Sequence, residues 1–233
     1  ANIPLMFLSN SITRDGRQMF ISTHSARFMM RPATDTTGIT YVNPDNVDFT
    51  AFFEKADPLG LSMLSALRMN ATFPYVLPNV WLPTVPVIDV MDAGLRDNFG
   101  TELSLRFISS FSDWLKQNTS KLVVIQIRDH STENMDEPVA NDDILSFVTK
   151  PLLVLQKNWF ALQDYYKTQD LSYFSKAYGN RFQKITFQYI PSQKDNVASI
   201  SFHLTAQEKK HIEASLNNPV NIASFDAVKE LLK

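Results

Sequence analysis

Apolar and polar residues alternate in short blocks at the start of the chain, and this pattern predicts strands joined by turns. The apolar runs 3–8 and 18–22 flank Asp15-Gly16, a dipeptide typical of a tight hairpin turn. Residues 26–30 are predicted to form a further short strand. Residues 31–48 are mostly polar and are interpreted as a loop. The sequence therefore predicts a β-hairpin followed by irregular chain.

Helical spacing of apolar residues appears next along the chain. It predicts a short helix over 49–55, capped by Asp48, and a second helix over 59–69. A third helix is predicted over 101–115, where apolar positions recur at intervals of three and four. We expect this third helix to pack against a sheet.

Between the second and third of these helices lies a short apolar run, Val85 to Met91, which is predicted to be a strand. Asp92-Ala93-Gly94 ends it, so the carboxylate of Asp92 is expected at the C-terminal edge of that strand. In α/β folds this edge is where ligands and catalytic groups gather. Asp97 and Asn98 precede the next helix and are interpreted as structural caps of its free N–H groups.

The second half of the chain mixes strands and helices. A buried strand is predicted over 121–128, and a strand with one wet face over 184–189. Thr205 to Glu208 forms a capping box, so a helix is expected to run to about Leu216. The remaining predicted elements are a long helix over 144–178, a strand over 199–204 and a final amphipathic helix over 225–232.

Composition narrows the function classes. The 233 residues are 44% hydrophobic, enough for a substantial core, and the net charge of −2 gives no electrostatic case for nucleic acid as a partner. The absence of cysteine excludes disulfides, thiolate metal sites and a cysteine nucleophile. The four histidines show no helical metal-pair spacing, so no metal site is predicted. Localisation stays open, because no signal peptide or membrane-spanning pattern occurs in this sequence.

Residues 65–107 carry a recognisable motif. In the patatin-like phospholipase family a segment S-A-x-x-x-P-x-x-x-P-P leads to D-G-G or D-G-A and then to x-x-D-N-x-G. Here residues 70–74 with Pro78 match the first part, and residues 92–94 with 97–100 match the second. The chain resembles that family over residues 3–128, with a departure at Ala93, where the family normally has glycine.

The resemblance implies a three-layer α/β sheet with flanking helices and a serine–aspartate dyad that hydrolyses lipid esters without a cofactor. It implies that Asp92 is the catalytic aspartate and that Ala93 and Gly94 form the active-site turn. The nucleophile elbow needs Gly-x-Ser-x-Gly. The chain has six glycines, and no two of them flank a serine in that way. We therefore expect the chain to supply the general base and to be inactive alone.

The domain organisation follows from the same resemblance. Residues 1–128 are interpreted as the C-terminal part of a patatin-like catalytic domain, and 129–233 as a helical and mixed α/β extension of the same domain. The chain begins at Ala1 and enters an apolar run almost at once, so we expect an incomplete domain whose partner is the missing N-terminal part. The alternative is a non-catalytic binding or scaffold domain of the same fold.

The aromatic segment 159–178 has two interpretations. Trp and Tyr suit a membrane interface, so peripheral membrane contact is one expectation. We favour the other, in which these side chains form the core-facing side of a helix, because basic residues for an anionic lipid surface are few.

Overall fold

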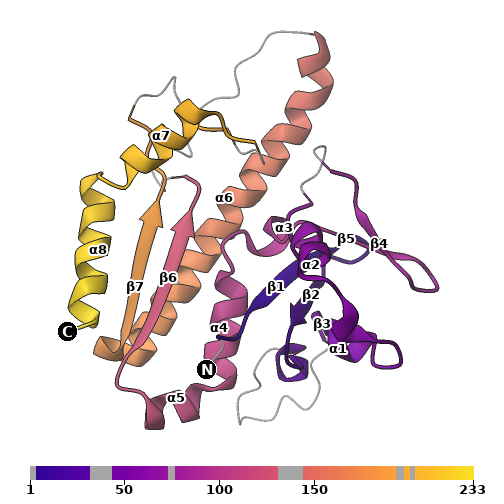
Figure 1. The fold of residues 1–233 in the computed structure, drawn as a ribbon, viewed down its shortest axis with the longest axis horizontal. Coiled ribbons are helices and arrows are strands. Elements are labelled where there is room, and N and C mark those ends of the chain that lie inside the picture. The colour runs from indigo at the N-terminus through magenta and orange to yellow at the C-terminus, as the bar shows by residue number, and fades with distance from the viewer. Residues whose placement is uncertain (1–3, 32–43, 73–76, 131–143, 193–196, 200–202) are drawn as a thin grey trace. The chain divides into compact units, whose positions relative to one another are not determined.

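The structure, a computed structural model, describes residues 4–31, 44–72, 77–130, 144–192, 197–199 and 203–233. It is a mixed α/β protein, in which the described residues form a five-stranded mixed sheet, a two-stranded parallel sheet and eight α-helices (Figure 1). The chain forms two compact units. Unit 1 comprises Ala1–Asn118 and Leu162–Leu171, and unit 2 comprises Thr119–Ala161 and Ser172–Lys233.

The larger sheet lies in unit 1 and has the strand order β3-β2-β1-β5-β4. Strand β2 pairs with β1 in antiparallel fashion and with β3 in parallel fashion, and β5 lies antiparallel between β1 and β4. The strands are β1 (Phe7–Ile12), β2 (Gln18–Ser22), β3 (Asn46–Asp48), β4 (Val80–Leu82) and β5 (Ile88–Met91).

The predicted N-terminal hairpin is confirmed, but its first strand is displaced along the chain. Strand β1 starts at Phe7, and the polar residues Ser9 to Ser11, expected in the turn, lie inside it and are buried. The turn is correspondingly short, and Gly16 adopts a positive φ of 74° there. The strand expected over 26–30 is wrong, since Arg27–Met29 forms a 3-10 helix, η1.

Helices cover both faces of the larger sheet. The helices α1 (Phe49–Phe52) and α2 (Met63–Asn70) pack on one face with a core that includes Ile12, Met19 and Val90. On the other face, η1 and α4 (Thr101–Ser110) enclose a core around Phe20. Burial of these apolar side chains is the main force that holds the layers together.

The helix predictions in this unit hold with revised bounds. Asp48 caps α1 as expected, since its side chain accepts a hydrogen bond from the Thr50 N–H. The helix predicted over 59–69 is divided into a 3-10 turn, η2 (Pro58–Gly60), and α2. The helix predicted over 101–115 is divided at Phe111 into α4 and α5 (Ser112–Asn118).

Unit 2 contains the parallel pair β6 (Leu122–Arg128) and β7 (Phe182–Gln188), with α8 (Pro219–Leu231) packed on β7 (Figure 1). The buried side chain of Asn221 accepts from the Gln188 N–H and donates to the Gln188 carbonyl, which fixes α8 to the end of β7. Unit 2 also contains η4 (Gly179–Arg181) and α7 (Ala206–Ser215). The capping box of α7 is confirmed.

Strand β6, which the sequence analysis grouped with residues 1–128, belongs to unit 2. Within the described part of the chain it pairs only with β7. Its Ile125 and Ile127 side chains are 52% and 78% exposed, whereas Gln126 and Arg128 are buried. The prediction of a strand is therefore confirmed, and the prediction that it is buried is wrong for these two isoleucines.

The long helix α6 (Ile144–Tyr178) confirms the prediction over 144–178, and its stretch Leu162–Leu171 belongs to unit 1. Four of its aromatic side chains are more than half exposed. The core-facing interpretation is therefore wrong for these four, which are Trp159, Tyr165, Tyr166 and Tyr173. Among the described helices, none is long and apolar enough to cross a membrane.

Candidate functional site

Asp92 directly follows β5, at the C-terminal end of that strand, where the sequence predicts it. Its backbone N–H donates to the Thr72 carbonyl oxygen at 3.0 Å. After Ala93 the chain turns into the short helix α3 (Gly94–Asp97). A strand, a turn and a helix of unit 1 thus meet at this carboxylate.

The two oxygens of the Asp92 carboxylate have different surroundings. Oδ1 accepts a hydrogen bond of 2.6 Å from the Gly94 N–H. Oδ2 has no hydrogen-bond partner among the described residues. The side chain is partly buried, and this burial raises the pKa of Asp92 above its ordinary value of 3.8, against the opposing effect of the Gly94 hydrogen bond. The group is therefore oriented by one oxygen and open at the other.

A side chain at position 94 would meet two close neighbours. A Cβ added there would lie 2.8 Å from Asp92 Oδ1 and 2.7 Å from Asn98 Oδ1, both closer than real Cβ contacts. Ala93 has no such restriction, and its N–H donates to the Asn70 carbonyl oxygen at 3.2 Å. The turn therefore accommodates the methyl group of Ala93, whereas a methyl group at position 94 would require the Asp92 and Asn98 side chains to shift.

Asn70, the last residue of α2, connects β1 to this turn. Its Oδ1 accepts from the Ser9 N–H of β1 at 2.8 Å, and its carbonyl oxygen accepts from Ala93. The β1–β5 ladder ends at Ser11 and Met91, and beyond it Asn70 bridges the two segments through these two hydrogen bonds. The sequence motif includes Asn70 but indicates no role for its side chain.

Gln163 of α6 is a second side chain at this site that the sequence pattern did not indicate. Its Nε2 donates to the carbonyl oxygens of Leu95 at 2.8 Å and of Gly94 at 3.3 Å. Gln163 is 8% exposed. These two bonds fix the first turn of α3. Gln163 lies in the part of α6 that belongs to unit 1, 69 residues after Gly94 and 68 after Leu95 in the sequence.

Asp97 and Asn98 lie one helical turn beyond Asp92. Asp97 is 2% exposed, and its Oδ2 accepts from the Leu103 N–H in the first turn of α4 at 3.0 Å. Burial raises the pKa of the Asp97 carboxyl, and hydrogen bonds from the backbone of α4 partly oppose this effect. For Asn98 the described residues show no corresponding bond to α4.

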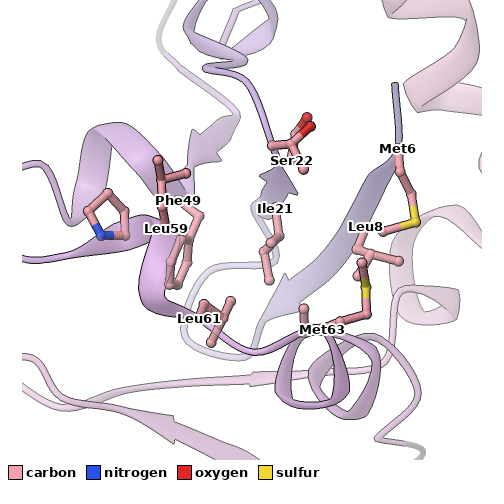
Figure 2. Close-up of a pocket in the computed structure, with 11 residues that line it drawn as sticks. Met6, Leu8, Ile21, Ser22, Phe49, Leu59, Leu61 and Met63 are labelled. Carbon is pink, nitrogen blue, oxygen red and sulfur yellow. The ribbon is translucent and has the colours of Figure 1, made fainter. Parts of the chain in front are cut away.

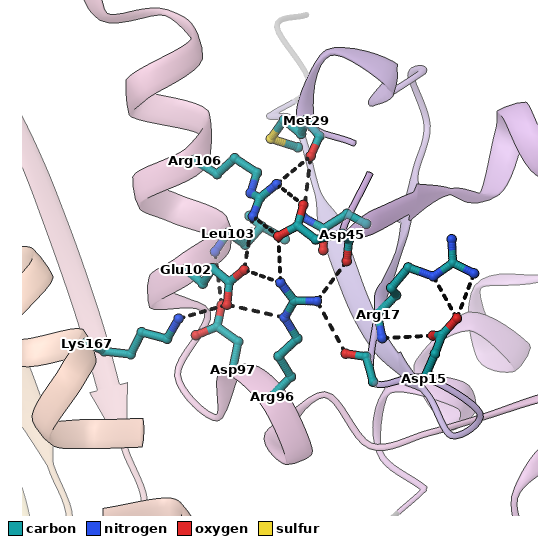
Figure 3. A network of polar contacts seen from close by, with 12 residues as sticks. Asp15, Arg17, Met29, Asp45, Arg96, Asp97, Glu102, Leu103, Arg106 and Lys167 are labelled. Carbon is teal, nitrogen blue, oxygen red and sulfur yellow. Dashed lines mark hydrogen bonds and ion pairs between the residues drawn. The ribbon is translucent and has the colours of Figure 1, made fainter. Parts of the chain in front are cut away.

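Next to this capping aspartate lies a network of ion pairs in unit 1 (Figure 3). Arg106 contacts Asp45 at 2.6 Å and Glu102 at 3.1 Å, and Arg96 contacts the same two carboxylates at 2.9 and 2.7 Å. Lys167 of α6 contacts Glu102 at 2.8 Å. Burial acts to raise the pKa of Glu102, but hydrogen bonds from Arg96 and Lys167 outweigh it and hold that pKa below its ordinary value.

An apolar pocket of about 100 Å³ lies in unit 1, on the sheet face that α1 and α2 cover (Figure 2). Two of its lining residues lie on elements that also contact the Asp92 turn. Leu8 in the pocket precedes Asn10 by two residues on β1, and Ala66 precedes Asn70 by one turn of α2. The other lining residues are Met6, Ile21, Ser22, Thr23, Phe49, Pro58, Leu59, Leu61 and Met63.

Part of the proposed motif cannot be placed, because Phe73 and Pro74 lie outside the described residues. So do three residues of the strand expected over 199–204. Within the described ranges, no group of three or more His, Asp or Glu side chains is arranged to hold a metal ion.

Comparisons with known proteins add no family. No protein-family model matches the chain, and a search of curated proteins finds no match.

Proposed function

We propose that this chain supplies the general-base aspartate of a serine–aspartate dyad that hydrolyses lipid esters, in a domain resembling the patatin-like phospholipases. Asp92 is the base, and Ala93 and Gly94 form the turn that orients it. A second segment, carrying Gly-x-Ser-x-Gly, supplies the nucleophile. The chain alone is inactive in this proposal.

The observation that carries the proposal is the state of the Asp92 carboxylate. A general base must be oriented, partly shielded from water and open to the proton that it takes. Gly94 orients Oδ1, burial raises the pKa, and Oδ2 is open among the described residues. An aspartate that served only as a turn cap would need the first of these features alone.

The chemistry is acyl transfer. The serine hydroxyl attacks the ester carbonyl while Asp92 takes its proton, and backbone N–H groups stabilise the oxyanion. Protonated Asp92 then returns the proton to the leaving alcohol. Water attacks the acyl-serine in a second step, with Asp92 again as base, and the carboxylic acid is released.

Three features of the fold support the proposal. Helices on both faces of the larger sheet agree with a three-layer arrangement. The exposed Ile125 and Ile127 of β6 agree with an incomplete domain, because parallel strands are normally buried on both faces. The apolar lining of the pocket beside β1 and α2 agrees with a short aliphatic group as part of the substrate.

The test is the activity of a parent protein that contains this chain and the sequence upstream of Ala1. We expect Asp92→Asn to lower hydrolysis of a short-chain nitrophenyl ester by at least about a hundredfold. Asp89→Asn is the matched control, since Asp89 lies three residues earlier, where it contacts Thr13 and Asn79. It should leave activity within about twofold. Equal activity of the two variants would remove Asp92 from the mechanism.

The alternative is a binding or scaffold domain. It is supported by the hydrogen bond from the Gly94 N–H to Asp92, because this bond alone would give the aspartate a structural role. The upstream sequence separates the two functions. If no Gly-x-Ser-x-Gly precedes the chain, this hydrolase mechanism is excluded and the binding function is the one to pursue. Ester hydrolysis by the purified 233-residue chain that is lost in Asp92→Asn would contradict the proposal that the chain is inactive alone.

A further inference from the structure

Asn10, in the middle of β1, has a buried side chain with no hydrogen-bond partner. It is 0% exposed, and neither Oδ1 nor Nδ2 forms a hydrogen bond with the described residues. Leaving a buried polar group unpaired destabilises the folded state, because the group loses its hydrogen bonds to water. Such groups are rare in folded proteins, and each one calls for a physical explanation.

The strand register places Asn10 beside Asp92. Ser11 pairs with Met91 and Ile12 with Val90 in the antiparallel ladder between β1 and β5. The same register continued by one residue puts Asn10 opposite Asp92. Because side chains alternate between faces, Asn10 and Asp92 share the face on which Ile12 and Val90 lie in one core.

The type of pairing brings these two side chains close together. The Thr13 N–H donates to the Asp89 carbonyl oxygen, so the hydrogen-bonded positions of the ladder are 13 with 89 and 11 with 91. Positions 10 and 92 then form a non-hydrogen-bonded pair, the type in which opposite side chains approach most closely. Asn70 holds the backbone next to both, through Ser9 and Ala93.

The chemistry of the two groups is complementary. The Asn10 amide offers an unused donor, and Asp92 Oδ2 is an acceptor without a partner among the described residues. No charged side chain contributes to the pKa of Asp92, which reflects burial and the Gly94 N–H. Asp89 contacts Thr13 and Asn79, and Arg68 is exposed on α2.

We propose that Asn10 is a positioning residue for Asp92, whose Nδ2–H donates to Asp92 Oδ2 through one bound water. The donor holds the carboxylate at both oxygens and favours its ionised form, while burial keeps it basic. A carboxylate oxygen has two lone pairs, so Oδ2 can still accept a proton. This role deepens the proposed function, on which its catalytic meaning rests, but the coupling itself can be measured without activity.

The test is the pKa of Asp92 in the 233-residue chain, followed by NMR of ¹³C-labelled aspartate carboxyls and assigned with Asp92→Asn. Asn10→Leu removes the donor at similar volume, and we expect the pKa of Asp92 to rise by about one unit. Met19→Leu is the control, because Met19 lies opposite Asn10 on β2 and is equally buried. It should leave the pKa of Asp92 unchanged. An unchanged pKa in folded Asn10→Leu overturns the inference.

A second measurement covers the case in which Asn10→Leu does not fold. In the wild-type chain the side-chain NH₂ resonances of Asn10 should shift with pH at the midpoint of Asp92, and this shift should vanish in Asp92→Asn. If the chemical shifts of these NH₂ resonances do not change with pH, the inference is overturned. If Asn10 and Asp92 titrate together but the longer protein does not hydrolyse esters, only the proposed function is contradicted. If hydrolysis depends on Asp92 but Asn10 does not respond to its titration, only this inference is contradicted.

Discussion

The Asp92 turn shows at the residue scale how packing and chemistry constrain the same atoms. The Gly94 N–H that orients the carboxylate can reach Oδ1 at 2.6 Å only because no side chain stands at position 94. Ala93, in contrast, already carries a Cβ, and its N–H donates to the Asn70 carbonyl oxygen. Of the two turn residues, position 94 is the one where an added side chain would disturb the carboxylate.

We predict that Gly94→Ala destabilises the fold by about 1–3 kcal/mol, because the new Cβ would collide with Asp92 Oδ1 and Asn98 Oδ1. Chemical unfolding followed by circular dichroism measures this loss. The double variant Gly94→Ala with Asn98→Ala should recover part of it, since one of the two contacts is then removed. A double variant no more stable than Gly94→Ala would show that the collision with Asn98 is not a cause.

At the element scale, strand and helix positions were largely predictable, and their bounds were not. Local pattern placed β5, β6, β7, α6 and α7, because each combines apolar periodicity with a clear start or stop. Strand β1 was displaced because Ser9, Asn10 and Ser11 are polar, and their burial is imposed by neighbouring strands on both sides. The polarity pattern of one segment cannot predict which strands will pair with it on each side.

The candidate site was predictable only in part for the same reason. Asp92 stands at the end of an apolar run, a signal that lies within one segment of the sequence. The side chains that act on its turn, Asn10, Asn70 and Gln163, come from three other elements and lack any local signal. Cross-strand register and tertiary contact, which the structure supplies, were needed to find them.

The capping box of α7 yields a prediction about pH. Glu208 accepts hydrogen bonds from the N–H and hydroxyl groups of both Ser199 and Thr205, and these lower its pKa from 4.5 to about 2. A lowered pKa means that the ionised form favours the folded state. The stabilisation is thus complete above pH 4.5 and is lost as the pH falls towards about 2.

We expect amide hydrogen exchange in the first turn of α7 to accelerate between about pH 4.5 and 2, after correction for intrinsic rates. In Glu208→Gln this additional acceleration should be absent. Glu213→Gln is the control, because Glu213 is exposed on the same helix and its carboxylate forms no hydrogen bond with the described residues. Identical profiles for wild type and Glu208→Gln would contradict the prediction.

At the scale of the whole molecule, the ion-pair network fixes parts of unit 1 that are far apart in the sequence. Arg106 of α4 joins Asp45, next to β3, and the Met29 carbonyl oxygen in η1. Arg96 adds the Gly16 carbonyl oxygen in the hairpin turn. These bonds span up to 80 residues, so they form only when most of unit 1 is folded.

We therefore predict that Arg106→Met lowers the free energy of unfolding by about 3 kcal/mol, because it leaves Asp45 and Glu102 without their most buried partner. Arg27→Met is the matched control. The Arg27–Glu54 pair has a similar separation of 2.8 Å, but the two side chains are 54% and 68% exposed. Its loss should cost less than about 1 kcal/mol, since water and salt screen such a pair. Denaturant unfolding of both variants measures the difference, and equal small losses would show that the buried network does not stabilise the fold.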